Sequence, residues 1–332
     1  MQHRAFLPWR NLAFILNTLW HSVSKIYDCA LAALAAVSAA SAQSTATISG
    51  TYGAGYQSFY NTTASSTSGA TAAGINKGFT QTDASVKVDV SEDLGGGLRA
   101  AGAVQFAQNP LRGGGLVKED SSLSLSGAFG TVAYANTRSS NTAIGSQVFA
   151  SWLPVVSFYS TGNVDSRADV DNFSYTSPEL IKGLKAGYTF SEGTEGVATS
   201  AAKTNTFSAT YSNGPLAAAV AYKSYNASAA GSNMANRSEM FVTYDAGVAK
   251  VGAGFGSKLT STGSALTAYG ISVPMGAITV GLNGASRGSL NFYEAGVVYA
   301  LSKRTSANVM FGNLEGGDNA GSQTRVGIKH TF

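Results

Sequence analysis

The chain of 332 residues is short of the side chains that build most catalytic and metal sites. It has a single cysteine, Cys29, and of its three histidines only His330 lies beyond residue 42. One thiol cannot form an intramolecular disulfide or a thiolate metal site. A serine or cysteine nucleophile normally needs a nearby histidine base, and no clustered His, Asp or Glu motif is recognisable. We therefore expect neither an enzyme nor a bound cofactor or metal.

Charge is also scarce. Charged residues make up 12% of the chain, about half the share usual in soluble proteins, yet the mean hydropathy is only +0.04. Glycine and small polar residues replace the missing charge. Six prolines with 16 Phe and 15 Tyr do not suit a disordered chain. No strongly apolar run of about 18 residues follows the N-terminal segment, so a membrane protein of this composition must cross with strands. No nucleic-acid partner is expected.

The first 42 residues carry a targeting signal. Lys25 precedes an apolar run at residues 30–37 (ALAALAAV), and an A-x-A motif ends at Ala42. This order predicts a signal peptide that is cleaved before Gln43 after Sec export. The expected mature domain spans residues 43–332, and loss of three cations and one anion lowers its net charge from +4 to +2.

Residues 1–24 do not fit a signal peptide. Their apolar run at residues 12–19 is separate from the later one, and eight residues are too few to span a bilayer. We therefore hypothesise that translation starts at Val23 rather than Met1, and peptide mapping that recovers residues 1–20 from cells would contradict this.

The last eleven residues (SQTRVGIKHTF) alternate like a strand. Val326, Ile328 and Phe332 fall on one face, whereas Arg325 and Lys329 fall on the other, because strand side chains alternate with a period of two. A soluble sandwich would bury the apolar face, and a membrane barrel would turn it to lipid. This strand alone leaves both arrangements open.

The rest of the mature chain favours the membrane barrel. Roughly sixteen strand-like runs of about 9 to 11 residues alternate apolar and polar side chains, as at residues 184–190, 237–245 and 293–301. Tight turns such as Asn213-Gly214 alternate with longer polar loops, and Asn-Gly is a strong hairpin signal. Spanning strands must close on themselves because unpaired backbone groups are costly in hydrocarbon. The pattern predicts an all-β fold, a 16-stranded antiparallel transmembrane β-barrel wide enough for an aqueous channel.

Five stretches carry a family likeness: residues 91–98 (SEDLGGGL), 125–132 (LSGAFGTV), 175–178 (YTSP), 299–305 (YALSKRT) and 326–332 (VGIKHTF). With them the mature chain resembles the general porins of the Gram-negative porin family, of the beta-proteobacterial type. The resemblance implies a homotrimer in the outer membrane, surrounded by lipid and lipopolysaccharide, that passes small hydrophilic solutes. It also implies that Phe332 belongs to the assembly signal read by the barrel-insertion machinery.

The resemblance further implies that the long connection at residues 138–170 is a constriction loop folded into the lumen. Its aromatic residues would pack on the inner wall, and carboxylates facing wall cations would set a transverse field. A surface loop with an incidental apolar patch is the alternative, although about 33 residues is long for a simple connector. The loop and its end supply four constriction candidates: Asp165, Arg167, Asp169 and Asp171.

The wall arginines of many relatives are missing here. The matching positions are Ser85, Glu119 and Asn136, but Lys87 and Arg138 follow two of them by two residues. We therefore predict weak ion selectivity, of undetermined sign. The remaining constriction candidates on the wall are Lys87, Arg99, Glu119, Arg138, Lys185, Arg325 and Lys329, and Arg237 is a further inward-facing cation.

Two other functions remain open. A substrate-specific channel would show saturable binding in its pore. A receptor or adhesin would use the outer loops, which are rich in Ser, Thr and Asn, and such a role is compatible with transport.

Overall fold

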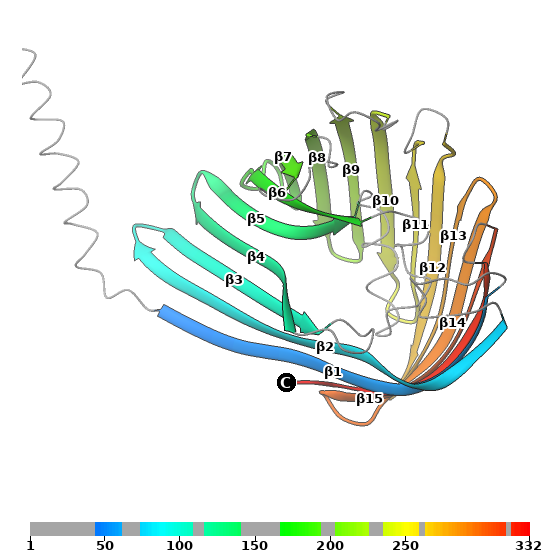
Figure 1. Ribbon diagram of the computed structural model, residues 1–332. Helices are drawn as coiled ribbons and strands as arrows, with labels where there is room; N and C mark the ends of the chain where they lie inside the picture. Colours follow the sequence, from blue (N-terminus) through cyan, green and yellow to red (C-terminus); the bar gives the residue numbers. More distant parts are fainter. Residues whose placement is uncertain are drawn as a thin grey trace, which may run out of the picture.

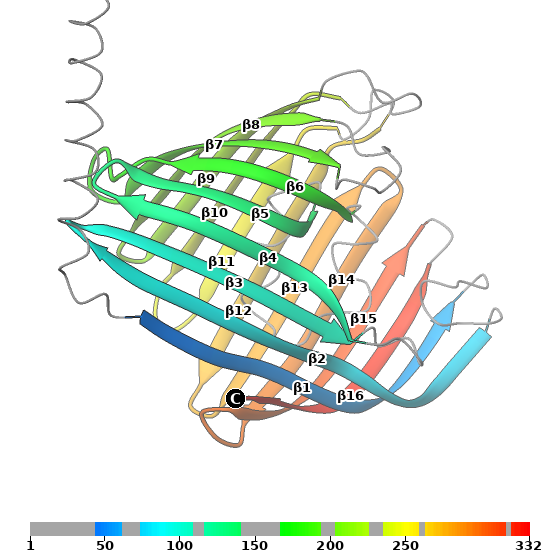
Figure 2. The same cartoon turned by 60° about the vertical axis from the view of Figure 1, so that its left-hand side comes forward.

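The computed structural model describes residues 44–61, 74–108, 116–140, 167–193, 203–225, 235–258, 263–316 and 320–332. They form sixteen antiparallel strands in one closed barrel (Figures 1 and 2). This confirms the predicted fold class and strand number. The strands are β1 (Ser44–Asn61), β2 (Gly74–Gly95), β3 (Leu98–Gln108), β4 (Leu116–Gly127), β5 (Gly130–Ser140), β6 (Arg167–Thr176), β7 (Leu184–Gly193), β8 (Thr204–Asn213), β9 (Leu216–Tyr225), β10 (Arg237–Asp245), β11 (Lys250–Gly256), β12 (Leu266–Met275), β13 (Ile278–Arg287), β14 (Leu290–Ala300), β15 (Thr305–Glu315) and β16 (Gly321–Thr331).

The barrel closes where β1 pairs with β16, the two strands lying side by side in Figure 2. At the end of this seam the backbone N–H of Gly50 donates to the oxygen of Phe332 at 3.1 Å, and the N–H of Phe332 donates back at 3.0 Å. Closure gives every strand two neighbours, so no edge is left with unpaired backbone groups. Phe332 therefore takes part in the last pairing that completes the barrel.

The faces of the strands sort as the sequence predicts. On β16, Val326 and Ile328 are about half exposed, whereas Gln323 is 1% exposed and Arg325 is 5% exposed. The same alternation of exposed apolar and buried side chains continues through β12 to β15. Many of the buried side chains are polar, so the apolar face is the outer one. That is the reverse of a soluble sandwich and the arrangement of a membrane barrel.

Connections at one end of the barrel are short. The pairs Ala128-Phe129 and Gly214-Pro215 each join two strands directly, and Gly214 has φ of +60°, a conformation that primed hairpin turns require. β2 continues to Gly95 beyond a bulge, so Gly96 and Gly97 form the turn into β3. At the other end, Gly288-Ser289 is a two-residue exception among longer connections.

The connection at residues 138–170 is shorter than predicted. β5 continues to Ser140 and β6 begins at Arg167, and these two residues are partners in the strand register. Regular pairing satisfies backbone groups that a loop would leave unpaired, so both ends of the segment belong to the wall. Residues 141–166, including Asp165, lie outside the described residues, so the predicted folding of this loop into the lumen stays a prediction.

Strand lengths also vary more than expected, from 7 residues in β11 to 22 in β2.

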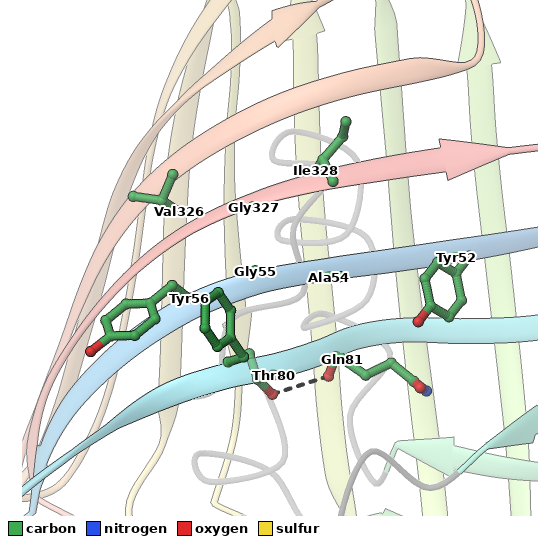
Figure 3. A pocket seen from close by; sticks show the side chains of 10 residues that line it. Tyr52, Ala54, Gly55, Tyr56, Thr80, Gln81, Val326, Gly327 and Ile328 are labelled. Atoms are coloured by element: carbon green, nitrogen blue, oxygen red, sulfur yellow. Dashed lines mark hydrogen bonds between the residues drawn. The ribbon is translucent and has the colours of Figure 1, made fainter.

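A shallow groove of about 550 Å³ follows the seam on the outer face (Figure 3). Tyr56 and Phe79 form one wall, with their rings edge-on and their centroids 5.4 Å apart. Gly55 pairs with Gly327 on β16, and a Cβ at Gly55 would lie 2.4 Å from the carbonyl oxygen of Val326, so the two strands approach each other closely beneath the groove. Within the described ranges, no helix has the length and apolar character needed to span a membrane.

Candidate channel lining

A band of polar side chains lies on the inner wall of β13 to β16 and β1. Asn283 and Glu294 are direct cross-strand partners, and each is only 2% exposed. On β16, the Gln323 amide donates to Oε1 of Gln57 on β1 at 3.2 Å. Arg325 donates to Sδ of Met310 at 3.1 Å. Such a band inside a barrel of outward apolar residues is what an aqueous channel wall requires.

An ion pair on the inner wall crosses the seam between β16 and β1. Nζ of Lys329 on β16 lies 3.6 Å from Oδ2 of Asp83 on β2, although β1 runs between the two strands. The pair forms over Gly53, the partner of both residues in the strand register. A Cβ at Gly53 would lie 2.3 Å from Oγ1 of Thr82 and 3.1 Å from Oδ2 of Asp83. The glycine therefore leaves room for this interaction.

Two further inner-wall cations have carboxylate partners. Nε of Arg237 lies 2.6 Å from Oε1 of Glu239, and both side chains are almost fully buried. Nζ of Lys87 lies 2.7 Å from Oδ1 of Asp89, and both are partly exposed. In the buried pair each charge neutralises the other, and a single unpaired charge at this depth would strongly destabilise the barrel. The exposed pair is screened by water and contributes little to stability.

Glu119 lies at a bulge between β3 and β4, where the register shifts at Gln105 and Phe106. The amide of Gln105, on the inner face, donates to Oε2 of Glu119 at 2.8 Å. Bulges redirect side chains at a sheet surface, and here the bulge turns Glu119 toward the lumen.

Asp171 lies on the outer face. It pairs in register with Asn136, two residues from the Tyr134–Phe173 pair, whose side chains are about half exposed. Oδ1 of Asp171 accepts hydrogen bonds from the Tyr134 hydroxyl at 2.8 Å and the Asn136 amide at 2.7 Å. Nζ of Lys118 donates to Oδ1 of Asn136. Strand parity therefore turns Asp171 away from the lumen, and its prediction as a constriction residue is wrong.

The structure separates the other candidates. Arg325, Lys329 and Lys87 lie along the inner wall, in or near the polar pairs described above. Arg99 and Lys185 are the second residues of β3 and β7, both exposed and close to the short turns. Arg138, Arg167 and Asp169 belong to β5 and β6, but their side chains lie outside the described part of the structure.

Sequence reasoning missed the inner-wall carboxylates Asp83, Asp89 and Glu294 as members of this lining. The alternation of residues 293–301 contained the signal, since Glu294 lies between the apolar Tyr293 and Ala295. For Asp83 the signal was hidden by the register shift between Gly53 and Ala54, which interrupts the parity along β2. In the described ranges, no three His, Cys, Asp or Glu side chains are grouped as a metal site.

Comparison with known proteins agrees with this architecture. A family model described as Gram-negative porin matches residues 30–319. No curated protein matches the chain in sequence.

Solved porin structures share the fold. An anion-selective porin from Comamonas acidovorans is 21% identical, with a TM-score of 0.65, and the match covers 87% of this chain and 100% of that one. A triple mutant of Rhodopseudomonas blastica porin is 14% identical, with a TM-score of 0.59 and the same coverage. At these identities the likeness shows the fold alone and does not extend to the wall charges.

Proposed function

The chain belongs to the Gram-negative porin family, and we propose that it is a general diffusion channel with weak ion selectivity. Family and fold indicate the outer membrane. In this proposal the protein is a homotrimer surrounded by lipid and lipopolysaccharide, inserted by the barrel-insertion machinery through a signal that includes Phe332. Small hydrophilic solutes and ions cross through the lumen without a cofactor.

The pairing of charges on the inner wall is the observation that supports weak selectivity. Arg237, Lys87 and Lys329 each have a carboxylate within 4 Å, and Arg325 lies within electrostatic range of Glu294 and Asp83. A wall whose cations are matched by anions produces dipoles rather than a net potential, and dipolar fields decay faster than the field of a single charge. A passing cation and a passing anion therefore meet similar average barriers.

Single-channel recording of the purified protein in a planar bilayer tests the proposal. We expect conductance steps in groups of three, and a reversal potential well below the roughly 59 mV that one tenfold gradient gives a perfectly selective channel. A reversal potential near that limit would refute weak selectivity. Absence of current from a folded, heat-modifiable barrel would refute the channel itself and would favour a receptor function of the outer loops.

A further inference from the structure

A hollow of about 280 Å³ lies on the inner wall of β1 to β4, near the end with the short turns. β3 creates it, because its inward row carries only methyl groups at Ala101 and Ala103 between the long side chains of Arg99 and Gln105. The volume equals that of about nine waters at ~30 Å³ each. Short turns face the periplasm in outer-membrane barrels, so the hollow belongs to the periplasmic side of the lumen.

The polar walls of the hollow consist of hydroxyl groups, the carboxylate of Asp89 and its ion-pair partner Lys87. In register with Ala101 lie Ser91 on β2 and Ser124 on β4. In register with Ala103 lie Asp89 and Ser122. The strands therefore place hydrogen-bonding groups on both sides of an apolar floor, which suits a solute that has C–H faces and several hydroxyl groups.

The cationic side chain of Arg99 lies at the periplasmic end of the hollow. Arg99 is exposed, and among the described residues no carboxylate lies within ion-pair distance of it. Its register partner Asp93 instead accepts the N–H of Gly95 at 2.9 Å. Lys87, by contrast, is paired with Asp89. A guanidinium group without an ion pair is suited to a bidentate hydrogen bond with a carboxylate.

We propose that this hollow binds small polyhydroxy carboxylates, the class of the sugar acids. The carboxylate binds Arg99, the hydroxyl groups bind the serines and Asp89, and the C–H face lies on Ala101 and Ala103. The inference rests on the proposed function, because the solute reaches the hollow through the lumen. It adds a weak, saturable preference to a channel that otherwise passes solutes by size.

Conductance in KCl with potassium D-gluconate added on either side tests the site, and sorbitol is the uncharged control. We expect gluconate to reduce the conductance saturably, faster from the turn side than from the loop side, with sorbitol much weaker. Arg99→Gln raises the half-blocking concentration about tenfold, the loss of one charge-assisted hydrogen bond. Ala101→Leu fills the hollow without changing its charge and also raises that concentration.

Lys185→Gln is the matched control, because Lys185 takes the same place in β7 as Arg99 in β3 but lies outside the hollow. It is expected to leave the half-blocking concentration within about twofold of the wild type, as for a distant exposed charge screened by salt. Equal effects of the two substitutions would overturn the proposal in favour of a general lumen potential. Equal effects of gluconate and sorbitol would overturn it as well.

The KCl conductance without gluconate reports separately on the proposed function. If the folded protein carries no current, calorimetric titration of the detergent-solubilised wild type and Arg99→Gln with gluconate still measures binding. Heat of binding that Arg99→Gln removes would support the hollow as a site. Its absence in the wild type would overturn it.

Discussion

Removal of Asp83 tests whether paired wall charges balance the selectivity of the channel. Asp83→Asn keeps the shape of the side chain but removes the carboxylate that lies 3.6 Å from Nζ of Lys329, and Arg325 also loses a nearby anion. A unit charge about 6 Å from a passing ion contributes about 0.7 kcal/mol in water, which a Debye length of ~10 Å reduces to about 0.4 kcal/mol. The effect has opposite signs for an anion and a cation, so the difference is about 0.8 kcal/mol, or roughly a fourfold change in permeability ratio toward anions.

The assay is the reversal potential in a planar bilayer. For a channel that starts close to non-selective, the constant-field equation converts a fourfold permeability ratio under a tenfold KCl gradient into a shift of roughly 25–30 mV, with about 59 mV for each tenfold ratio of its weighted concentrations. Lys329→Gln should shift the potential the other way, because the inner wall then loses a cation and keeps the charge of Asp83. The double variant should return close to the wild type. Shifts of the two single variants in the same direction, or no shift with Asp83→Asn, would refute the reasoning.

Two further predictions concern the stability of the barrel. A Cβ at Gly50 would lie 2.3 Å from Cζ of Phe332, so Gly50→Val is expected to lower the midpoint temperature of the heat-modifiable band, at a cost of about 1–3 kcal/mol for overpacking. Gly78→Val, where a Cβ meets no atom within 4 Å, is the control, and an equal loss there would contradict the role of the seam. Arg237→Met removes the guanidinium group that lies 2.6 Å from the buried carboxylate of Glu239 and should destabilise the barrel by about 3–5 kcal/mol in urea unfolding. The double variant with Glu239→Leu should recover most of that loss, and failure to recover would contradict the ion pair as the cause.

The sequence predicted much of the candidate lining, except where a bulge or a strand end changes which face a residue occupies. Arg325 and Lys329 were predicted to face inward because β16 alternates without interruption, and the structure has this arrangement. Asp171 was not predicted correctly from its place near a long connection, because the connection is shorter than expected and the residue belongs to β6. Bulges at Thr82, opposite Gly53 and Ala54, and at Glu119 shift the parity of their strands, and a bulge has no reliable signature in the sequence of a single strand.

The sequence by itself determined the properties that depend on neighbours along the chain. The period of two assigns each residue to the lipid or the lumen face, and Asn213-Gly214 specifies a hairpin through a glycine that accepts positive φ. These local patterns also determined the number of strands and the need for closure.

Only the tertiary structure decided which charges meet. Lys329 contacts Asp83 because closure places β16, β1 and β2 side by side, and because Gly53 leaves the space between them open. Arg99 borders a hollow because two alanines of β3 lie in register with serines of β2 and β4. Contacts of this kind depend on the register between strands, a property of the paired backbones that no single strand contains.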